Sequence, residues 1–423
     1  PAFQANVNAE ATEHVKRLRH HPSLALWCGN NEVAKAWQSW GWQDMYNLHG
    51  QDSARVAEAA SAMFNGLLPD VVKEHCGTLY LPTSPTLEAD AGDAHAWGIW
   101  FGKEPWEYYS RHEGRFASEY GLQSLPHLAT LQEAGILTFQ DEALQFRQRS
   151  KMDWLEPGFD GWGMMRHYMS TTMGAPARDS LEAWIVQSQM TQAEGLRQAL
   201  ERHRTSMGKY AGSLYWSMND VWPAVSWSTV DHAGRWKLGQ HAAKRANAPR
   251  TVLWERASED SLRLRAFNDL PSPVSGHLAV QCQTMDGVVL KDTSVAWRCP
   301  ALGTIRLNLG PMDLWRETPK SSFLAWQWTD AAHPGDTLRQ SALWEDAVDV
   351  NLPTSHIDVS VSDVRLTIVS SGYVPMAWVG CDLPGRFSDN GMPLEPHVPV
   401  HITFSPEEDQ AEPRTFQVRG TGQ

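Results

Sequence analysis

The stretch Ser23–Glu32, SLALWCGNNE, changes within a single step from an apolar run to two amides and a carboxylate. Its first half, Ser23–Trp27, has the length and composition of a short buried strand. Polar side chains such as Asn30, Asn31 and Glu32 are mostly found outside protein cores. The stretch therefore predicts a buried strand whose last residues leave the sheet at a functional edge.

The first 250 residues repeat this alternation of short apolar runs with longer helical patterns, as βα units do. One helix is predicted from the apolar spacing over 56–68, with Pro69 kinking or ending it. Asp179 and Glu182 resemble a capping box that opens a second helix running to about Arg202. Further strands are predicted at 77–85, 92–100, 114–121 and 212–220.

Three of these later strands also end on polar groups. In a (β/α) barrel the active site forms where the carboxyl ends of the strands meet, so polar residues there indicate a site. Four such endings in order along the chain favour a barrel with its site at this edge. The three later endings are Asp93–His95, Ser118–Glu119 and Asn219–Asp220.

From about Arg250 the hydrophobic period changes from 3.6 to 2. Short alternating strands with turn signals and no helical patterns are typical of β-sandwiches. The chain is therefore predicted to contain a region of βα units over 1–249 and two sandwiches over 250–352 and 353–423, with a linker at Pro353. The clearest alternating runs are 261–267, 277–287 with a turn at Asp286–Gly287, 357–368 and 398–404.

Composition excludes several functions for this chain of 423 residues. Its net charge of −13, without any Lys/Arg run, argues against nucleic acid or an anionic membrane as a partner. No stretch has the apolar length of a membrane span. The five cysteines form no CxxC pair, so we predict neither zinc nor disulfides, and GxSxG, HExxH, GxGxxG and Walker patterns are absent. We expect no metal and no cofactor.

Two strand endings carry a glutamate, Glu32 and Glu119. Glycoside cleavage needs two carboxyl groups flanking one bond, one to protonate the leaving oxygen and one to meet the developing cation. For either glutamate alone, a solvated strand end or a helix N-cap is an equal alternative. The 21 tryptophans suit core packing, and their flat faces also suit stacking on sugar rings.

The motifs around both glutamates resemble the β-mannosidases of glycoside hydrolase family 2. The resemblance implies α/β plus all-β architecture, with strands 4 to 8 of a (β/α)8 TIM barrel followed by two immunoglobulin-like β-sandwich domains. The matching segments are HPSLALWCGNNE (21–32), YLPTSP (80–85), GDAHAWGIW (92–100), RFASEYGLQSLP (115–126), SLYWSMNDVWPAVSWSTVD (213–231) and RFSDNGMPLEP (386–396).

The resemblance also implies roles for single residues. Glu32 would be the general acid/base and Glu119 the nucleophile of a retaining exo-β-mannosidase that removes terminal β-D-mannose from β-mannoside oligosaccharides. Asn31 would bind the 2-hydroxyl of the sugar. His95, Trp97 and Trp216 would line the pocket around the terminal mannose.

The chain departs from the family pattern in three places. Ala96 stands where an aromatic residue is common, and Ser217 stands where a glutamine is usual. Only 22 residues precede the strand at Ser23, whereas three βα units would need roughly 90. We therefore expect the N-terminal half of the same polypeptide to be missing and the fragment alone to be inactive.

Two alternatives to a β-mannosidase remain open from the sequence. Another family 2 exo-glycosidase, a β-galactosidase or β-glucuronidase, would keep both glutamates and differ in its sugar. A non-catalytic carbohydrate-binding protein would use the tryptophans alone and would not depend on Glu32 or Glu119.

Overall fold

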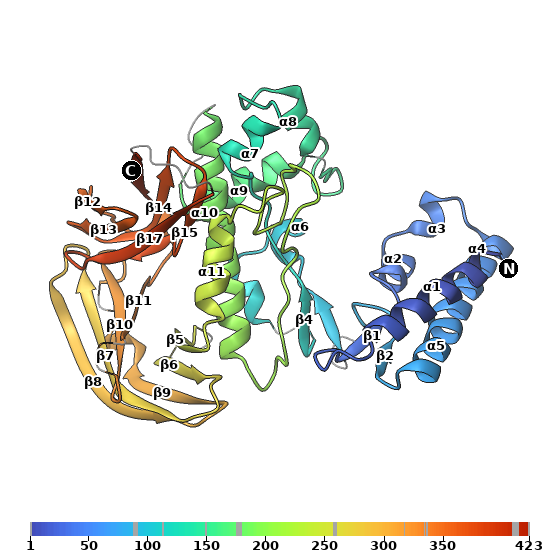
Figure 1. The fold of residues 1–423 in the computed structure, drawn as a ribbon, viewed down its shortest axis with the longest axis horizontal. Helices are drawn as coiled ribbons and strands as arrows, with labels where there is room; N and C mark the ends of the chain where they lie inside the picture. Colours follow the sequence, from blue (N-terminus) through green and yellow to red (C-terminus); the bar gives the residue numbers. More distant parts are fainter. Residues whose placement is uncertain are drawn as a thin grey trace. The chain divides into compact units, whose positions relative to one another are not determined.

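The computed structural model consists of two compact units, each described here by itself (Figure 1). Unit 1 comprises Pro1–Ala96, His112–Glu119 and Gly208–Leu214, and unit 2 comprises the remainder. The structure describes residues 2–87, 92–111, 114–148, 150–174, 180–256, 260–316, 318–333, 335, 337–407 and 414–421. None of the helices described there combines the length and apolar character that crossing a membrane requires.

Unit 1 is built on short parallel strands that follow one another along the chain. Strand β1 (Leu26–Cys28) pairs in parallel with β2 (Leu79–Leu81), and β3 (Asp93–His95) pairs in parallel with β4 (Phe116–Glu119). Parallel neighbours need a crossover between them, and the helices supply it between β1 and β2. These helices are α2 (Val33–Ser39), α3 (Trp42–Met45), α4 (Gly50–Ser61), the π-helical segment η1 (Ala62–Leu67) and α5 (Leu68–His75), whereas α1 (Ala2–Leu18) precedes β1.

The helix predicted over 56–68 does not end at Pro69. It continues through the π-helical segment into α5, and Pro69 occupies the first turn of that helix. In the π turn the backbone N–H of Leu68 bonds to Met63 O, five residues earlier. A proline in the first turn of a helix lacks only an N–H that would have no partner there. The wider π turn just before Pro69 places it in such a first turn, so the helix continues.

The strand predicted at 212–220 is shorter than expected. Within unit 1 only Ser213 bridges to Ala117, in parallel, with Ala117 N bonding to Gly212 O and Leu214 N to Ala117 O. Side-chain alternation predicted a longer strand, but the rest of the segment, in unit 2, makes scattered contacts: Trp216 N bonds to Tyr120 O at 2.8 Å, and Asn219 bridges to Val230.

Helix α10 (Leu181–Thr205) is the central helix of unit 2 and is buried along most of its length. It packs against α11 and α9 (Figure 1). The predicted helix is confirmed, but its N-cap is Ser180, whose hydroxyl accepts from Ala183 N; Asp179 lies outside the described residues. The other helices of unit 2 are α6 (Gly98–Phe101), η2 (Trp106–Ser110), α7 (Leu128–Glu133), α8 (Glu142–Arg147), α9 (Gly161–Thr172) and α11 (Leu238–Ala246).

Two sheets with a shared core follow these helices. Their orders are β5-β6-β9 and β11-β10-β7-β8, all antiparallel. One apolar cluster takes residues from both sheets, including Leu264, Val280 and Trp326, as in a β-sandwich. The elements are β5 (Arg250–Trp254), β6 (Ser261–Asn268), β7 (Val274–Thr284), β8 (Val289–Cys299), β9 (Gly303–Pro311), η3 (Met312–Leu314), β10 (Ser322–Asp330), β11 (Thr337–Leu343) and η4 (Ala347–Asp349).

A second pair of sheets completes unit 2, with orders β12-β13-β17-β15 and β16-β14-β18 around one core cluster. The alternating run 357–368 proves to be a hairpin and not one strand, because the chain reverses at Asp363, where φ is 56°. The strands are β12 (Ile357–Ser362), β13 (Arg365–Ser370), β14 (Val374–Cys381), β15 (Gly385–Phe387), β16 (Met392–Leu394), β17 (Val400–Pro406) and β18 (Phe416–Gly420).

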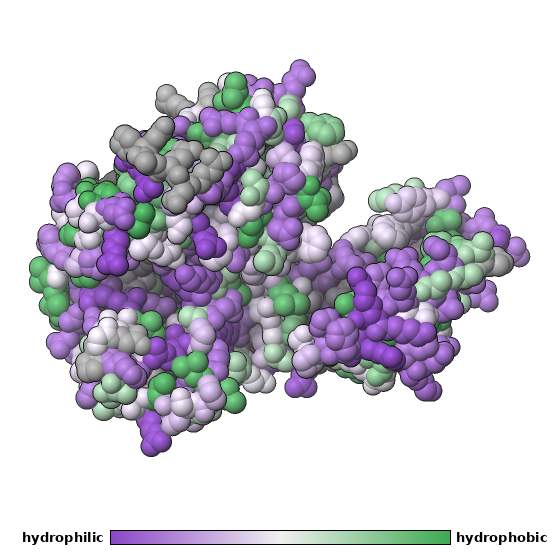
Figure 2. All heavy atoms as spheres, in the orientation of Figure 1, coloured by the Kyte–Doolittle hydropathy of each residue, from purple (hydrophilic) through white to green (hydrophobic). Residues whose placement is uncertain are grey.

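Apolar side chains remain exposed on the strands of unit 1. Leu26 and Leu79, which are partners in the β1–β2 register, are 39% and 61% exposed. Hydrophobic residues are also visible among hydrophilic ones on the face shown in Figure 2. Leucines on paired strands usually face a core, so this pair marks a surface that another part of a protein could cover.

Candidate active site

The chain keeps its parallel pairing for several residues beyond β1. Gly29 N bonds to Leu81 O at 2.8 Å, Ser84 N to Asn30 O at 3.0 Å, and Glu32 N to Ser84 O at 2.7 Å. Only then does the backbone turn into α2. These bonds fix the backbone that carries Glu32.

Asn30 shapes the turn itself. Its amide nitrogen donates to Pro82 O at 2.7 Å, and its amide oxygen accepts from Val33 N at 3.1 Å and from Thr83 Oγ1 at 2.9 Å. Glu32 follows with φ 63°, in the left-handed region, and occupies the N-cap position of α2. Its side chain makes no cap hydrogen bond, which argues against the helix-cap alternative for this residue.

The ends of β3 and β4 bring His95 and Glu119 together. These residues are partners in the parallel register, and Ala96 N bonds to Glu119 O at 2.7 Å. Side chains of adjacent residues in a strand point to opposite faces, so the register decides which ones share an edge. Here it places His95 beside the carboxylate of Glu119.

Glu32, His95 and Glu119 form one hydrogen-bonded cluster. His95 Nδ1 lies 2.8 Å from Glu32 Oε1 and 3.2 Å from Glu119 Oε2. The three facing atoms all lie within 4.8 Å of one another. The side chains are 5% (His95), 14% (Glu119) and 23% (Glu32) exposed, so the cluster is sheltered and is most open at Glu32.

This separation would also let the three atoms surround a metal ion. The 2.8 Å contact between Nδ1 and Oε1, however, has the length of a charge-assisted hydrogen bond, and a bond of that kind accounts for the geometry without an ion. The contacts of His95 with both glutamates therefore join the three side chains into one cluster.

Behind His95 lies a buried carboxylate whose role the sequence did not reveal. Asp93 Oδ2 accepts from Ser84 Oγ at 2.5 Å and from Ser118 Oγ at 2.6 Å, and Oδ1 accepts from Thr86 N at 2.9 Å. Ser84 Oγ also lies 3.0 Å from His95 Nε2. The sequence signals were a polar strand end at Asp93 and a serine before Pro85, but neither indicates a partner.

The other candidate residues are placed differently. Asn31 is exposed and belongs to unit 1. Trp97 and Trp216 belong to unit 2. There the ring of Trp97 packs edge-on against Phe101 and Trp227, at centroid distances of 5.1 and 6.1 Å, and Trp216 is 49% exposed.

Ala96 and Ser217, two of the three departures from the family pattern, make the following backbone contacts. Ala96 is buried and contributes its backbone N–H to Glu119 O. Ser217 N donates to Trp227 O at 3.2 Å in unit 2.

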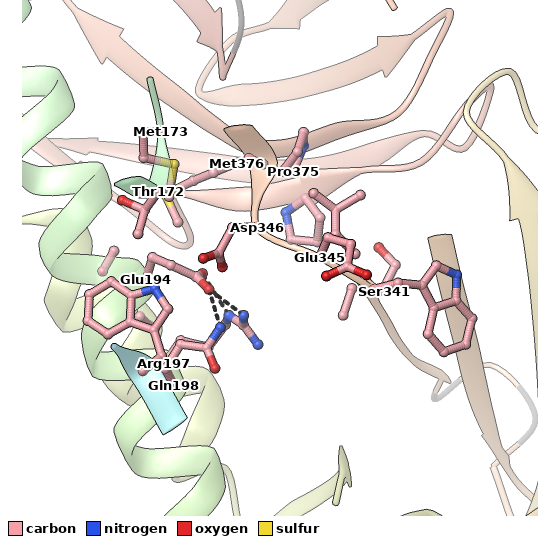
Figure 3. Close-up of a pocket in the computed structure, with 18 of the residues that line it drawn as sticks. Thr172, Met173, Glu194, Arg197, Gln198, Ser341, Glu345, Asp346, Pro375 and Met376 are labelled. Atoms are coloured by element: carbon pink, nitrogen blue, oxygen red, sulfur yellow. Dashed lines mark hydrogen bonds and ion pairs between the residues drawn. The ribbon is translucent and has the colours of Figure 1, made fainter. Parts of the chain in front are cut away.

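A separate cavity of about 190 Å³ lies inside unit 2, and its described lining includes none of the candidate site residues. Figure 3 shows Glu194 bonded to Arg197 and Gln198 on α10, with Asp346 near them. Burial favours the neutral form of Glu194, but Arg197 outweighs burial and lowers the pKa of Glu194 to about 2. At Asp346, burial together with the charges of Glu194 and Glu107 raises the pKa to about 6.

Comparisons with known proteins agree with this architecture. The family model Ig_mannosidase, an Ig-fold domain, matches residues 347–420. β-Mannosidase B of Thermothelomyces thermophilus is 34% identical over 266 residues, covering 60% of this chain and 31% of that protein. The corresponding Aspergillus niger protein is 28% identical over 311 residues, covering 68% and 36%.

Solved structures share the fold at lower identity. β-D-Mannosidase from Dictyoglomus thermophilum has a TM-score of 0.78 at 23% identity, covering 99% of this chain and 51% of that one. The exo-chitosanase CsxA of Amycolatopsis orientalis has a TM-score of 0.64 at 15% identity, covering 98% and 52%. The chain thus spans about a third of the length of the curated relatives and about half of these structures.

By its fold and its sequence relatives, the chain is similar to glycoside hydrolases. Within that class it is similar to a C-terminal portion of the β-mannosidases, including their Ig-fold domain.

Proposed function

We propose that the enzyme containing this chain is a retaining exo-β-mannosidase, with Glu119 as nucleophile and Glu32 as general acid/base. The observation that carries the proposal is the pair of glutamate oxygens within 4.8 Å of each other at strand ends. Retaining pairs lie about 5–5.5 Å apart, whereas inverting pairs need about 6.5–9.5 Å to admit a water. The short separation supports the retaining class.

The reaction proceeds in two displacements. Glu119 attacks the anomeric carbon while the glycosidic C–O bond breaks. The leaving oxygen keeps the electron pair of that bond and receives a proton from Glu32. In the second step Glu32 removes a proton from water, whose oxygen attacks the same carbon and returns the ester electrons to Glu119. Glu32 is the more exposed of the two glutamates, as a group that meets both leaving group and water should be.

Recognition of mannose is assigned to Asn31, His95, Trp97 and Trp216. Asn31 precedes the acid/base and is exposed, so its amide is available to the axial 2-hydroxyl that distinguishes mannose. Trp97 and Trp216 provide flat apolar faces for a sugar ring. His95, already bonded to Glu32, would contribute to the same pocket.

The proposed architecture is strands four to eight of a (β/α)8 barrel over 1–249, followed by sandwiches over 250–352 and 353–423. Consecutive parallel strands in unit 1 and the two core clusters of unit 2 support it. Exposed Leu26 and Leu79 support the view that the chain by itself is inactive, because a barrel needs every strand to close.

The first test replaces the nucleophile in the full-length enzyme. Glu119→Gln should abolish hydrolysis of an aryl β-mannoside, because an amide cannot form the glycosyl ester. In Glu32→Ala, azide should restore turnover of a substrate with an activated leaving group, since such a group needs no protonation. Full activity of Glu119→Gln, or release of mannose with inverted configuration in an NMR time course, would refute the assignment.

A panel of aryl glycosides separates the proposed function from its rivals. Selective hydrolysis of the mannoside supports it, and selective hydrolysis of the galactoside or glucuronide points to another branch of the family. Sugar binding that is unaffected by Glu32→Gln and Glu119→Gln, without any hydrolysis, would indicate a carbohydrate-binding protein.

A further inference from the structure

The buried carboxylate of Asp93 determines which atoms donate and which accept in the hydrogen bonds behind the catalytic cluster. An ionised carboxylate only accepts hydrogen bonds, and Asp93 accepts from Thr86 N, Ser84 Oγ and Ser118 Oγ. The contact from Ser84 is 2.5 Å long, in the range of charge-assisted O–H···O⁻ bonds. The single hydroxyl proton of Ser84 therefore points to Asp93.

This leaves Ser84 only as an acceptor towards His95. The distance of 3.0 Å between Ser84 Oγ and His95 Nε2 is a hydrogen bond only if Nε2 carries the proton, because the hydroxyl proton is already used. Asp93, through Ser84, thus fixes which nitrogen of His95 is a permanent donor.

The second nitrogen then faces both catalytic carboxylates. Nδ1 lies 2.8 Å from Glu32 Oε1 and 3.2 Å from Glu119 Oε2, where a bare lone pair would meet oxygen lone pairs. One proton must occupy the contact between Nδ1 and Oε1. Placed on Oε1 it is the acid proton of the first step, and placed on Nδ1 it makes an imidazolium with the same total charge.

We propose that Asp93 is a positioning residue which, by holding His95 with a proton on Nε2, makes Nδ1 share the acid proton with Glu32. The inference rests on the proposed roles of Glu32 and Glu119. In the first step the shared proton passes to the leaving oxygen as the glycosidic bond breaks. The Glu32–His95 pair then lacks one proton, which it regains from the attacking water, so the cycle balances.

The first experiment determines the protonated nitrogen directly, without substrate. Nitrogen-15 NMR of the full-length enzyme labelled at histidine should show His95 with a protonated Nε2, its signals identified by their loss in His95→Gln. In Asp93→Asn the amide donates to Ser84 Oγ, which then turns its proton to Nε2, and the ring should carry its proton on Nδ1 instead. A wild-type ring without a proton on Nε2 would overturn the inference.

The second experiment measures the consequence for acid catalysis. In Asp93→Asn, kcat/KM should fall about 100-fold for a mannobiose, whose leaving group needs a proton, and only a few-fold for a dinitrophenyl mannoside. The basic limb of the pH profile of kcat/KM should move to lower pH by about one unit, because the acid proton is held less tightly. Among the described residues, the charged groups that face His95 are Glu32, Glu119 and, through Ser84, Asp93.

Ser118→Ala is the matched control. It removes a hydroxyl that donates to the same oxygen of Asp93 but leaves the bond from Ser84 in place. The ring should keep its proton on Nε2, and kcat/KM should change by the same factor for both substrates. If Asp93→Asn does not fold, Ser84→Ala replaces it and should show the same dependence on leaving group.

The outcomes separate the two proposals. Equal losses for both substrates in Asp93→Asn and Ser84→Ala would overturn the positioning role. An enzyme that hydrolyses no β-mannoside although His95 has the expected protonation would overturn the proposed function, and with it the catalytic part of this inference.

Discussion

At the residue scale, Gly29 determines how closely the chain after β1 can approach β2. A Cβ atom at this position would lie 2.2 Å from Tyr80 Oη and 2.6 Å from Pro82 O. Tyr80 cannot move freely, because its hydroxyl donates to Phe64 O at 2.7 Å, and Pro82 O belongs to the backbone. Glycine is required here by contact and not by backbone conformation.

Gly29→Ala should therefore destabilise the enzyme by about 1–3 kcal/mol through overpacking. It should also lower kcat, since even a 1 Å displacement of a catalytic group can cost about 10²-fold. Thermal unfolding and hydrolysis of an aryl β-mannoside measure the two effects. Gly66→Ala, with nothing within 4 Å of the new Cβ, is the control and should leave activity unchanged.

Some residues of the candidate cluster can be picked out from the sequence and others cannot, for a physical reason. Glu32 and Glu119 directly follow apolar runs, and a strand end is a local feature that a sequence displays. Asp93 and Ser84 act through a hydroxyl whose partner depends on which strands become neighbours. That information lies in the fold, so only the structure reveals the path from Asp93 to His95.

At the element scale, side-chain periodicity predicted the type of structure better than its limits. Alternation of apolar and polar side chains identified β6 and β7. The same alternation continues across the turn at Asp363 between β12 and β13, because a residue in the left-handed region reverses the chain without interrupting the apolar pattern. Likewise 212–220 reads as one strand but only Ser213 bridges to β4. Register and turn geometry depend on neighbouring elements and not on the segment alone.

The loop after β11 packs an acidic residue against α10. Asp346 has a pKa raised to about 6 by burial and by Glu194 and Glu107, which outweigh the opposing effect of Arg256. Its folded pKa lies above its ordinary value near 3.8, so its contribution to stability is present below about pH 4 and is lost as pH rises through 6.

Asp346→Asn should therefore stabilise the protein above about pH 6 and have no such effect near pH 4. Two pKa units correspond to nearly 3 kcal/mol, which partial exposure reduces to about 1–2 kcal/mol. Denaturant unfolding at several pH values measures the gain. Asp292→Asn, on the exposed face of β8, is the control, and an equal gain there would contradict the explanation.

At the scale of the whole molecule, ion pairs join the helices of unit 2 to its last sandwich. Arg235 bonds to Glu133 on α7 at 2.6 Å and to Glu407 after β17 at 2.8 Å, and it donates to Thr130 Oγ1 at 2.8 Å. These hydrogen bonds, chiefly with Glu133, raise the pKa of Arg235. The sandwich is thus attached by a largely buried guanidinium.

Arg235→Met should lower the free energy of unfolding by about 2 kcal/mol, less than a fully buried pair would, because both glutamates stay partly exposed and can be hydrated. Arg419→Met removes an exposed pair with Glu182 that also links the last sandwich to a helix, and should cost less than about 1 kcal/mol. Chemical denaturation compares the two. Equal losses would show that burial of Arg235 does not matter.

The left-handed backbone of Glu32 has a practical consequence for anyone who needs an inert but correctly folded protein, for instance to trap a sugar in a crystal. At φ 63° a β-branched replacement is sterically disfavoured, whereas glycine and asparagine adopt this region readily. In a library with all amino acids at position 32, some variants would therefore lose activity because they fold poorly and not because they lack the carboxylate. Valine is therefore the replacement to avoid here, whereas glycine and asparagine remove the carboxylate and keep the backbone.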